Sequence, residues 1–340
     1  MASEWPIDAP PIVGRTSAAV SRQAADGDRR LAAVLQDFFL PTETRLTEQE
    51  RALMTAMLHG LIGRIADEIR ARLDPATAQA CPAEAAELVA DLSRAGLLQD
   101  QALVGLLLRR ADVQRLAARA SGGRTRLQRW TASLDAEVAA AAMALITARG
   151  RGRDRFGRAA LDLPDCPPPL AMRLVQVVAA ALGARCSVAS DAEVAAAAAD
   201  LLGDNAFGER LEILEERLAT ALLLAGAREP NLLVELAQEG EAPILSALLA
   251  EEAGIPAEEG WRCLLGGGEQ LALLLRMAAV TREEAAALLA HAGPALGIGD
   301  PVHAIDRFDA LGEAEVRAAR AELALPQGYR RAQAVLARHG

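Results

Sequence analysis

The chain has 340 residues, a formal net charge of -10 and 52% hydrophobic residues, but only 3% aromatic residues. This length allows two domains or one extended repeat array, and a core of Ala, Leu and Val favours closely packed helices. Lysine is absent and all 36 basic residues are arginine, which excludes a Schiff-base lysine, a phosphate-loop lysine and the lysine of a protein kinase.

The start of the chain and its apolar runs predict no secretory signal and no membrane span. "MASEWPIDAPPIVG" lacks a basic start followed by an apolar run, and the apolar runs fall well short of the roughly 20 residues that cross a bilayer. We therefore expect a cytoplasmic protein without membrane contact. Cys81, Cys166, Cys186 and Cys263 show neither metal-ligand pairs nor a dense disulfide framework, and are predicted to be buried or incidental thiols.

Helical signals follow a proline-containing start, residues 1–16, which we predict to be a mobile tail. Thr47 stands three residues before Glu50, a capping-box spacing that opens a helix running to about Leu73. The next predicted helices cover residues 82–95, 100–119, 124–133 and 135–149. Together these elements predict an N-terminal helical domain over residues 17–149.

Residues 150–169 interrupt the helical pattern with three glycines and the run Pro167-Pro168-Pro169. We expect a stiff Arg/Gly/Pro-rich linker there, followed by a C-terminal helical-hairpin domain over residues 170–340. In that domain "RLEILEERLATALLLAG" carries leucines on one helix face and glutamates on the other. Glutamate doublets such as Glu215-Glu216 are predicted to be solvated, since adjacent helical residues point about 100° apart.

Four glycines in the second half recur at intervals of 14 residues: Gly226, Gly240, Gly254 and Gly268. A proline follows each of the first three by two to four residues, as expected where glycine ends one helix and proline opens the next. Such short units predict antiparallel hairpins stacked like a helical solenoid. The sequence thus predicts an all-α protein with two regions of antiparallel helical hairpins, the second solenoid-like.

No residue pattern indicates catalysis, a metal or a cofactor. The four histidines are too far apart in sequence to share a helix face, and no nucleophile-elbow, zinc-protease or dinucleotide motif occurs. The glycine-rich residues 264–272 follow a helix instead of a strand, so a helix-to-helix turn is favoured over a phosphate site. We expect a protein that is not an enzyme, with no catalytic residues, no metal and no cofactor.

Positive charge is concentrated between Arg109 and Arg158, where twelve arginines face four acidic residues. The segment has a net charge of +8, so the rest of the chain sums to -18. Aromatic residues lie beside the arginines in "RTRLQRW" and "RDRFGR". The predicted partner-binding residues are Arg124, Arg126, Arg129, Trp130, Arg151, Arg153, Arg155 and Phe156.

Three interpretations of this arginine segment remain open. The arginines form ion pairs with acidic helices of the same chain, or they bind an acidic or phosphorylated protein partner. Alternatively, arginines grip phosphates while aromatic residues stack on bases, which would make the protein a nucleic-acid-binding regulator. We favour a non-enzymatic scaffold or regulatory protein–protein interaction module of unknown biological role, with the nucleic-acid regulator as its alternative.

Three stretches together resemble a bacterial family known as domain of unknown function 2336. The first stretch is "DFFLPTETRLTEQERALMTAMLHGLIGRIADEIR". The second is "ARGRGRDRFGRAALDLP", which leads into "AMRLVQVVAAAL". The third is "GIPAEEGWRCLLGGGEQLALLLRMAAVTREEAAALL". The resemblance covers most of residues 31–292. It implies an all-helical, HEAT-like protein of uncharacterised role, and it makes the Arg-Asp-Arg-Phe-Gly element at residues 153–157 part of a family pattern.

Overall fold

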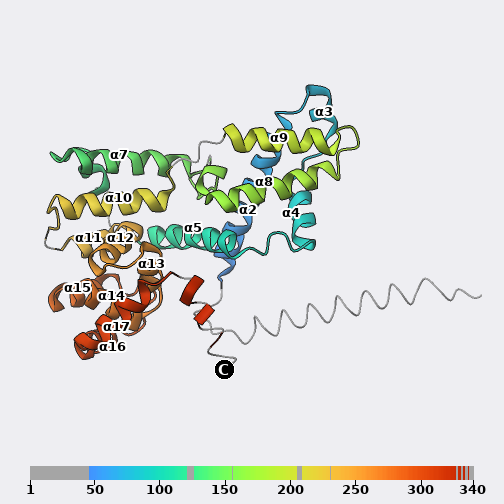
Figure 1. Cartoon of the computed structure of the whole chain (residues 1–340). Helices are drawn as coiled ribbons and strands as arrows, with labels where there is room; N and C mark the ends of the chain where they lie inside the picture. The colour runs from blue at the N-terminus through green and yellow to red at the C-terminus, as the bar shows by residue number, and fades with distance from the viewer. Residues whose placement is uncertain are drawn as a thin grey trace, which may run out of the picture. The chain divides into compact units, whose positions relative to one another are not determined.

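The structure is a computed structural model of the chain. It describes residues 46–120, 126–154, 156–204, 209–229, 231–326, 328–330, 332–333 and 336. Apart from one isolated bridge between Arg153 and Ala159, the regular elements in these residues are helices (Figure 1). The predicted all-α class is therefore confirmed.

The first half of the described chain contains α2 (Glu48–Arg70), α3 (Pro75–Ala80), α4 (Ala85–Arg94), α5 (Gln101–Arg119), α6 (Arg126–Trp130), α7 (Ala136–Arg151), the short 3₁₀ helix η2 (Leu163–Asp165) and α8 (Pro168–Gly183). The second half contains α9 (Asp191–Asp204), α10 (Leu211–Leu224), α11 (Leu232–Gln238), α12 (Ala242–Ala253), α13 (Ala257–Leu265), α14 (Gly268–Met277), α15 (Arg282–Ala292), α16 (Pro301–Ala310) and α17 (Glu313–Leu323).

Local capping explains where several of these helices begin. The backbone N–H of Glu50 donates to Thr47 Oγ1 at 3.2 Å, and the N–H of Thr47 donates to the Glu50 carboxylate at 2.8 Å. Thr281 caps α15 in the same way, accepting from the N–H of Glu284 at 3.2 Å. Both pairs satisfy N–H groups that the helix itself leaves without partners, and the predicted capping position at Thr47 is confirmed.

The regular glycine spacing marks helix ends at three of its four positions. Left-handed φ angles follow α10, α11 and α12 at Gly226 (61°), Gly240 (72°) and Gly254 (68°). Gly268 is instead the first residue of α14, and the left-handed residue of that turn is Gly267, with φ of 90°. Consecutive helices α12, α13 and α14 pack against one another, and the solenoid-like repeat stays a prediction.

Contacts divide the chain into two units, Met1–Arg51 and Ala52–Gly340. The structure describes residues 46–51 of the first unit, and the predicted mobile tail at residues 1–16 lies outside the described residues. None of the helices in the described ranges is long and apolar enough to cross a membrane.

Two hydrophobic cores organise the second unit. The first core joins α2, α4, the first half of α5, residues 161–166, α8 and α9. The second core joins the end of α5, then α6, α7 and the helices from α10 to α16. Helix α5 contributes to both, with Leu107 in the first core and Leu116 in the second.

The segment at residues 150–169 is packed instead of extended. Helix α7 continues to Arg151, α8 begins at Pro168, and Leu161 between them is fully buried in the first core. Each core takes residues from both sides of this segment. The described chain therefore does not separate there into two cores, and the predicted domain boundaries stay a prediction.

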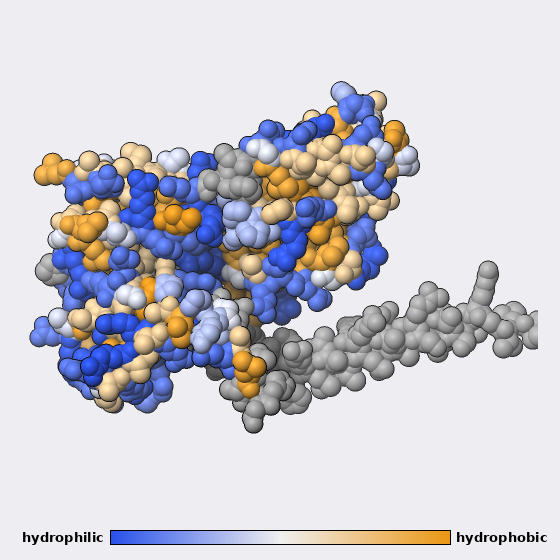
Figure 2. Space-filling model, viewed as in Figure 1, coloured by the Kyte–Doolittle hydropathy of each residue, from blue (hydrophilic) through white to orange (hydrophobic). Residues whose placement is uncertain are grey.

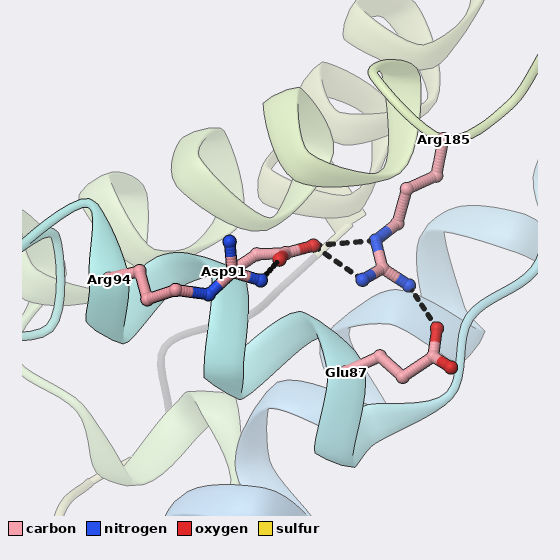
Figure 3. Close-up of polar contacts among 4 residues, drawn as sticks. All are labelled: Glu87, Asp91, Arg94 and Arg185. Atoms are coloured by element: carbon pink, nitrogen blue, oxygen red, sulfur yellow. Dashed lines mark hydrogen bonds and ion pairs between the residues drawn. The ribbon is translucent and has the colours of Figure 1, made fainter. Parts of the chain in front are cut away.

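A disulfide joins Cys81, after α3, to Cys186, after α8. Our expectation of free thiols is therefore wrong for this pair, because the two residues lie 105 positions apart and meet only in the folded chain. The neighbouring Arg185 reinforces the junction: its Nε donates to Asp91 Oδ2 at 2.8 Å, and its guanidinium also pairs with Glu87 (Figure 3). This disulfide and these ion pairs fasten the end of α8 to the α3–α4 region.

Cys166 and Cys263 are free and buried, as the sequence predicts. Burial raises the pKa of the Cys166 thiol to about 12 and that of Cys263 to about 11. Both groups are therefore protonated at neutral pH. Since the thiolate is the reactive form, both are poor nucleophiles in the folded protein.

Alkylation with iodoacetamide distinguishes the two kinds of cysteine. We expect no adducts on the folded, unreduced protein, two after unfolding without reductant, and four after unfolding with reductant, because two thiols are buried and two are in a disulfide. Intact-mass spectrometry counts the adducts. Four adducts after unfolding without reductant would show that the Cys81–Cys186 bond had not formed.

Candidate functional site

A buried cluster of arginine and glutamate side chains lies where the two cores meet. We call it the central ion cluster; its members are Arg109 and Arg110 of α5, Arg149 of α7, Glu212 and Glu215 of α10, and Glu241 immediately before α12. Helix α10 packs against both α7 and α12, so it brings these side chains together (Figure 1). Three guanidinium groups thus face three carboxyl groups.

The contacts in the central ion cluster are direct. The shortest ones join Arg109 Nη2 to Glu215 Oε2 (2.9 Å), Arg110 Nη1 to Glu212 Oε1 (2.9 Å) and Arg149 Nη1 to Glu241 Oε2 (2.6 Å). Arg149 Nη2 also lies 3.8 Å from Glu215 Oε1. The side chains of Glu215 and Glu241 are only 4% and 2% exposed. Such groups are stable inside a protein only when they are paired.

The prediction that glutamate doublets are solvated is wrong for Glu215. Its neighbour Glu216 is exposed, as predicted, but the angle of about 100° between adjacent helical residues turns Glu215 toward α5 and α7. Glu259 of α13 is buried in a similar way, next to Arg262 and Arg330. In each doublet one carboxylate faces solvent while the other pairs with arginine inside the protein.

The cluster shifts the pKa values of its carboxyl groups in opposite directions. Burial raises the pKa of Glu215, although Arg109 and Arg149 oppose the shift. Burial alone would also raise the pKa of Glu212, but Arg110 and Arg109 outweigh it and hold that pKa below its usual range. A raised carboxyl pKa is a feature of acid–base sites, yet structural ion networks produce it too. The two guanidinium groups on Glu215 favour a structural role.

Two of the predicted partner-binding residues point into the protein. Arg126 of α6 lies 2.9 Å from Glu229, pairs with Glu235 and has a side chain only 6% exposed. Trp130 is packed in the second core. Arg129 between them is 63% exposed, whereas Arg124 lies outside the described residues. The intramolecular pairing that the sequence left open is therefore present at Arg126 and in the central ion cluster.

Arg153 and Phe156 belong to a tight turn that we call the 152–159 hairpin, and Arg151 is the last residue of α7, directly before it. Asp154 Oδ1 accepts from the N–H groups of Phe156 and Arg158, both at 2.8 Å, and the N–H of Asp154 donates to the Arg158 carbonyl at 2.9 Å. Gly157 has a φ of 75°, which favours glycine, and its carbonyl accepts from Arg153 Nη1 at 2.7 Å. The turn is held in shape by its own residues.

Side-chain exposure on the hairpin is opposite to that on α6. Phe156 is 66% exposed, and the Arg158 guanidinium lies 5.1 Å from the centre of its ring. Arg151 and Arg153 are exposed as well, while Arg155 lies outside the described residues. The hairpin is attached to α5 by Gln114, whose Oε1 accepts from the N–H of Ala159 at 2.8 Å. The structure therefore places Arg153 and Phe156 on the accessible hairpin and Arg151, also exposed, at the end of α7 directly before it.

A pocket of about 380 Å³ is lined by residues of the hairpin and by part of the central ion cluster. Its walls come from α5, the end of α7, the hairpin, the start of α10 and residues 240–243. Arg110, Arg149, Glu215 and Glu241 contribute polar groups from the cluster, while Phe156 does not line it. We call this cavity the hairpin pocket. Of the arginines that line the pocket, the sequence predicted a binding role for Arg153, but no sequence pattern indicated the cavity itself.

Comparison of the chain with protein-family models, with curated proteins and with solved structures finds no match. The resemblance to the domain of unknown function 2336 family stays a prediction.

Removing one charge from the central ion cluster tests its contribution to stability. We expect Glu215→Gln to lower the free energy of unfolding by about 3–5 kcal/mol, because Arg109 and Arg149 lose a buried partner. Glu216→Gln changes the adjacent, exposed glutamate and should shift it by less than about 0.5 kcal/mol. Urea denaturation of the three proteins measures both values. Equal effects of the two substitutions would contradict the structural role.

The pH dependence of the 152–159 hairpin follows from Asp154. Burial opposes the shift, but hydrogen bonds from the Arg158 and Phe156 N–H groups and the Arg158 guanidinium hold the pKa of Asp154 below 3.8. A depressed folded pKa gives stability that is present above the unfolded value and lost as pH falls through the folded one.

We therefore expect the Phe156 and Arg158 amides to stay protected from hydrogen exchange from neutral pH down to 3.8, and to lose protection at lower pH. Exchange rates corrected for the intrinsic effect of pH measure this. Asp154→Asn should remove the transition. A transition that persists in that variant would assign it to another group.

Proposed function

We propose that the chain is a non-enzymatic scaffold or regulatory interaction module that docks an acidic or phosphorylated protein partner through the 152–159 hairpin. The observation that carries this proposal is Phe156, which is 66% exposed on a turn fixed by hydrogen bonds on both sides. Large aromatic side chains often supply much of the binding energy at protein interfaces. A turn that is already ordered loses little conformational entropy when a partner binds.

Exposed arginines give the hairpin a preference for acidic surfaces. Arg153 lies three residues before Phe156 on the hairpin, Arg151 ends α7 directly before the hairpin, and all three side chains are exposed. Arginine and a carboxylate or phosphate form short, charge-assisted hydrogen bonds. The arginines therefore add specificity to the contact that Phe156 makes. On the face of the molecule shown in Figure 2, apolar and hydrophilic residues lie side by side.

A nucleic-acid partner has less support from the arrangement of the arginines. Arg126 is engaged with carboxylates, and Trp130 is packed in the second core. These were the residues expected to grip phosphate and stack on a base beside Arg129. The chain also carries a net charge of -10, which opposes binding of a polyanion. The nucleic-acid regulator therefore remains the alternative to the protein partner.

We place this activity in the cytoplasm, as the sequence predicts. The Cys81–Cys186 disulfide does not favour this location, because stable disulfides are rare in proteins of reducing compartments such as the cytoplasm. Trapping of thiols in intact cells, followed by mass spectrometry of the Cys81 and Cys186 peptides, shows whether the bond exists where the protein works.

Capture from a native extract tests the docking proposal. We expect tagged wild-type protein to retain a defined protein partner after nuclease treatment, and Phe156→Ala or Arg151→Gln to lose most of it because the aromatic anchor or its neighbouring charge is gone. Mass spectrometry quantifies the retained partner.

Two matched variants serve as controls. Leu134→Ala removes another exposed apolar side chain, and Arg282→Gln removes another exposed arginine. Both should keep the partner. Equal retention by Phe156→Ala and wild type would overturn the proposal, and recovery that disappears with nuclease would favour the nucleic-acid alternative.

A further inference from the structure

The hairpin pocket has the size and lining of a small-ligand site. Its volume of about 380 Å³ falls within the range of about 300–1,000 Å³ that is usual for such sites. Aliphatic and small side chains form much of its wall: Val113, Ala117, Ala118, Leu211 and Pro243. An apolar group of moderate size therefore fits this part of the cavity.

The charges around the hairpin pocket nearly cancel, and one cation is left over. In the central ion cluster beneath it, three guanidinium groups face three carboxyl groups. Arg158 at the rim pairs with Asp154 at 2.9 Å. Arg153, also at the rim, donates one hydrogen bond to the neutral Gly157 carbonyl, and its other nitrogens have no partner among the residues that the structure describes. Among the described residues that line it, the pocket thus has one available positive charge, that of Arg153.

A single surplus cation selects among anions. Glu215 and Glu241 also line the pocket, so a dianion such as a phosphate monoester meets their repulsion with only one arginine to offset it. A carboxylate carries one charge and matches the two-pronged donor geometry of a guanidinium.

We infer that the hairpin pocket binds an apolar group that bears one carboxylate, with Arg153 pairing the carboxylate and the Val113, Ala118 and Leu211 wall holding the apolar part. Two sources share this chemistry: a free monocarboxylic acid, and the C-terminal residue of a protein chain that ends in an apolar side chain. The site goes beyond the proposed docking function, because Phe156 does not line the pocket.

Calorimetric titration with defined probes tests the inference on the full-length protein. Octanoate represents the free acid, and octanamide is its neutral counterpart. A tripeptide ending in leucine, with a free or an amidated C-terminus, represents the protein source. We expect the carboxylate of at least one pair to bind at least about tenfold more tightly than its amide, because only the carboxylate pairs with Arg153. The pair that shows the difference identifies the source.

Two variants locate the binding. Arg153→Gln removes the charge but keeps a donor for the Gly157 carbonyl, and should weaken carboxylate binding about tenfold. Ala118→Leu adds volume at an exposed, helix-compatible position of the pocket wall and should abolish binding. Arg282→Gln removes an exposed charge outside the pocket and should leave the affinity unchanged.

The outcomes separate this inference from the docking proposal. Phe156→Ala should bind the carboxylate probe like wild type, even where it loses the protein partner. The inference is overturned if wild type binds none of the four probes, if carboxylates and amides bind equally, or if Ala118→Leu binds as wild type does. None of those results changes the outcome expected for capture of a partner by Phe156.

Discussion

The arrangement of α5, α7, α10 and α12 depends on the central ion cluster. Glu215 is almost completely buried and contacts arginines from two different helices, so a shift of either helix would remove one of the two arginines that pair with this buried carboxyl group. The cluster therefore specifies how α5 and α7 lie against α10. Helix α7 ends two residues after Arg149, where the 152–159 hairpin begins, and the same contacts position the hairpin and its pocket.

Local features of the fold were predictable from the sequence, whereas long-range pairings were not. The caps at Thr47 and Thr281 and the helix ends at the spaced glycines depend on residues within one or two turns of each other. The Arg109–Glu215 contact joins residues 106 positions apart, and the Cys81–Cys186 bond joins residues 105 apart. The sequence left ion pairs within the chain as one of three interpretations of the arginines, and it could not identify the carboxylates that pair with them.

The candidate site was predicted in part for the same reason. Arginine beside an aromatic residue occurs in both "RTRLQRW" and "RDRFGR", and the sequence treats the two alike. In the structure, α6 turns Arg126 and Trp130 inward, while the hairpin turns Phe156 outward. The difference arises from Asp154 and Gly157, which shape the turn of the second motif, whereas Arg126–Trp130 of the first motif form one short helix against the second core.

The two cores alternate along the chain. Residues 57–111 and 161–202 build the first core, while residues 116–148 and the residues after 211 build the second. No single cut in the chain separates one complete core from the other. During synthesis on a ribosome, α6 and α7 emerge before α10 exists. The apolar faces of α6 and α7 therefore lack this partner helix of the second core while α8 and α9, which belong to the first core, are being made. The order of translation thus leaves part of the second core exposed while the first is being completed.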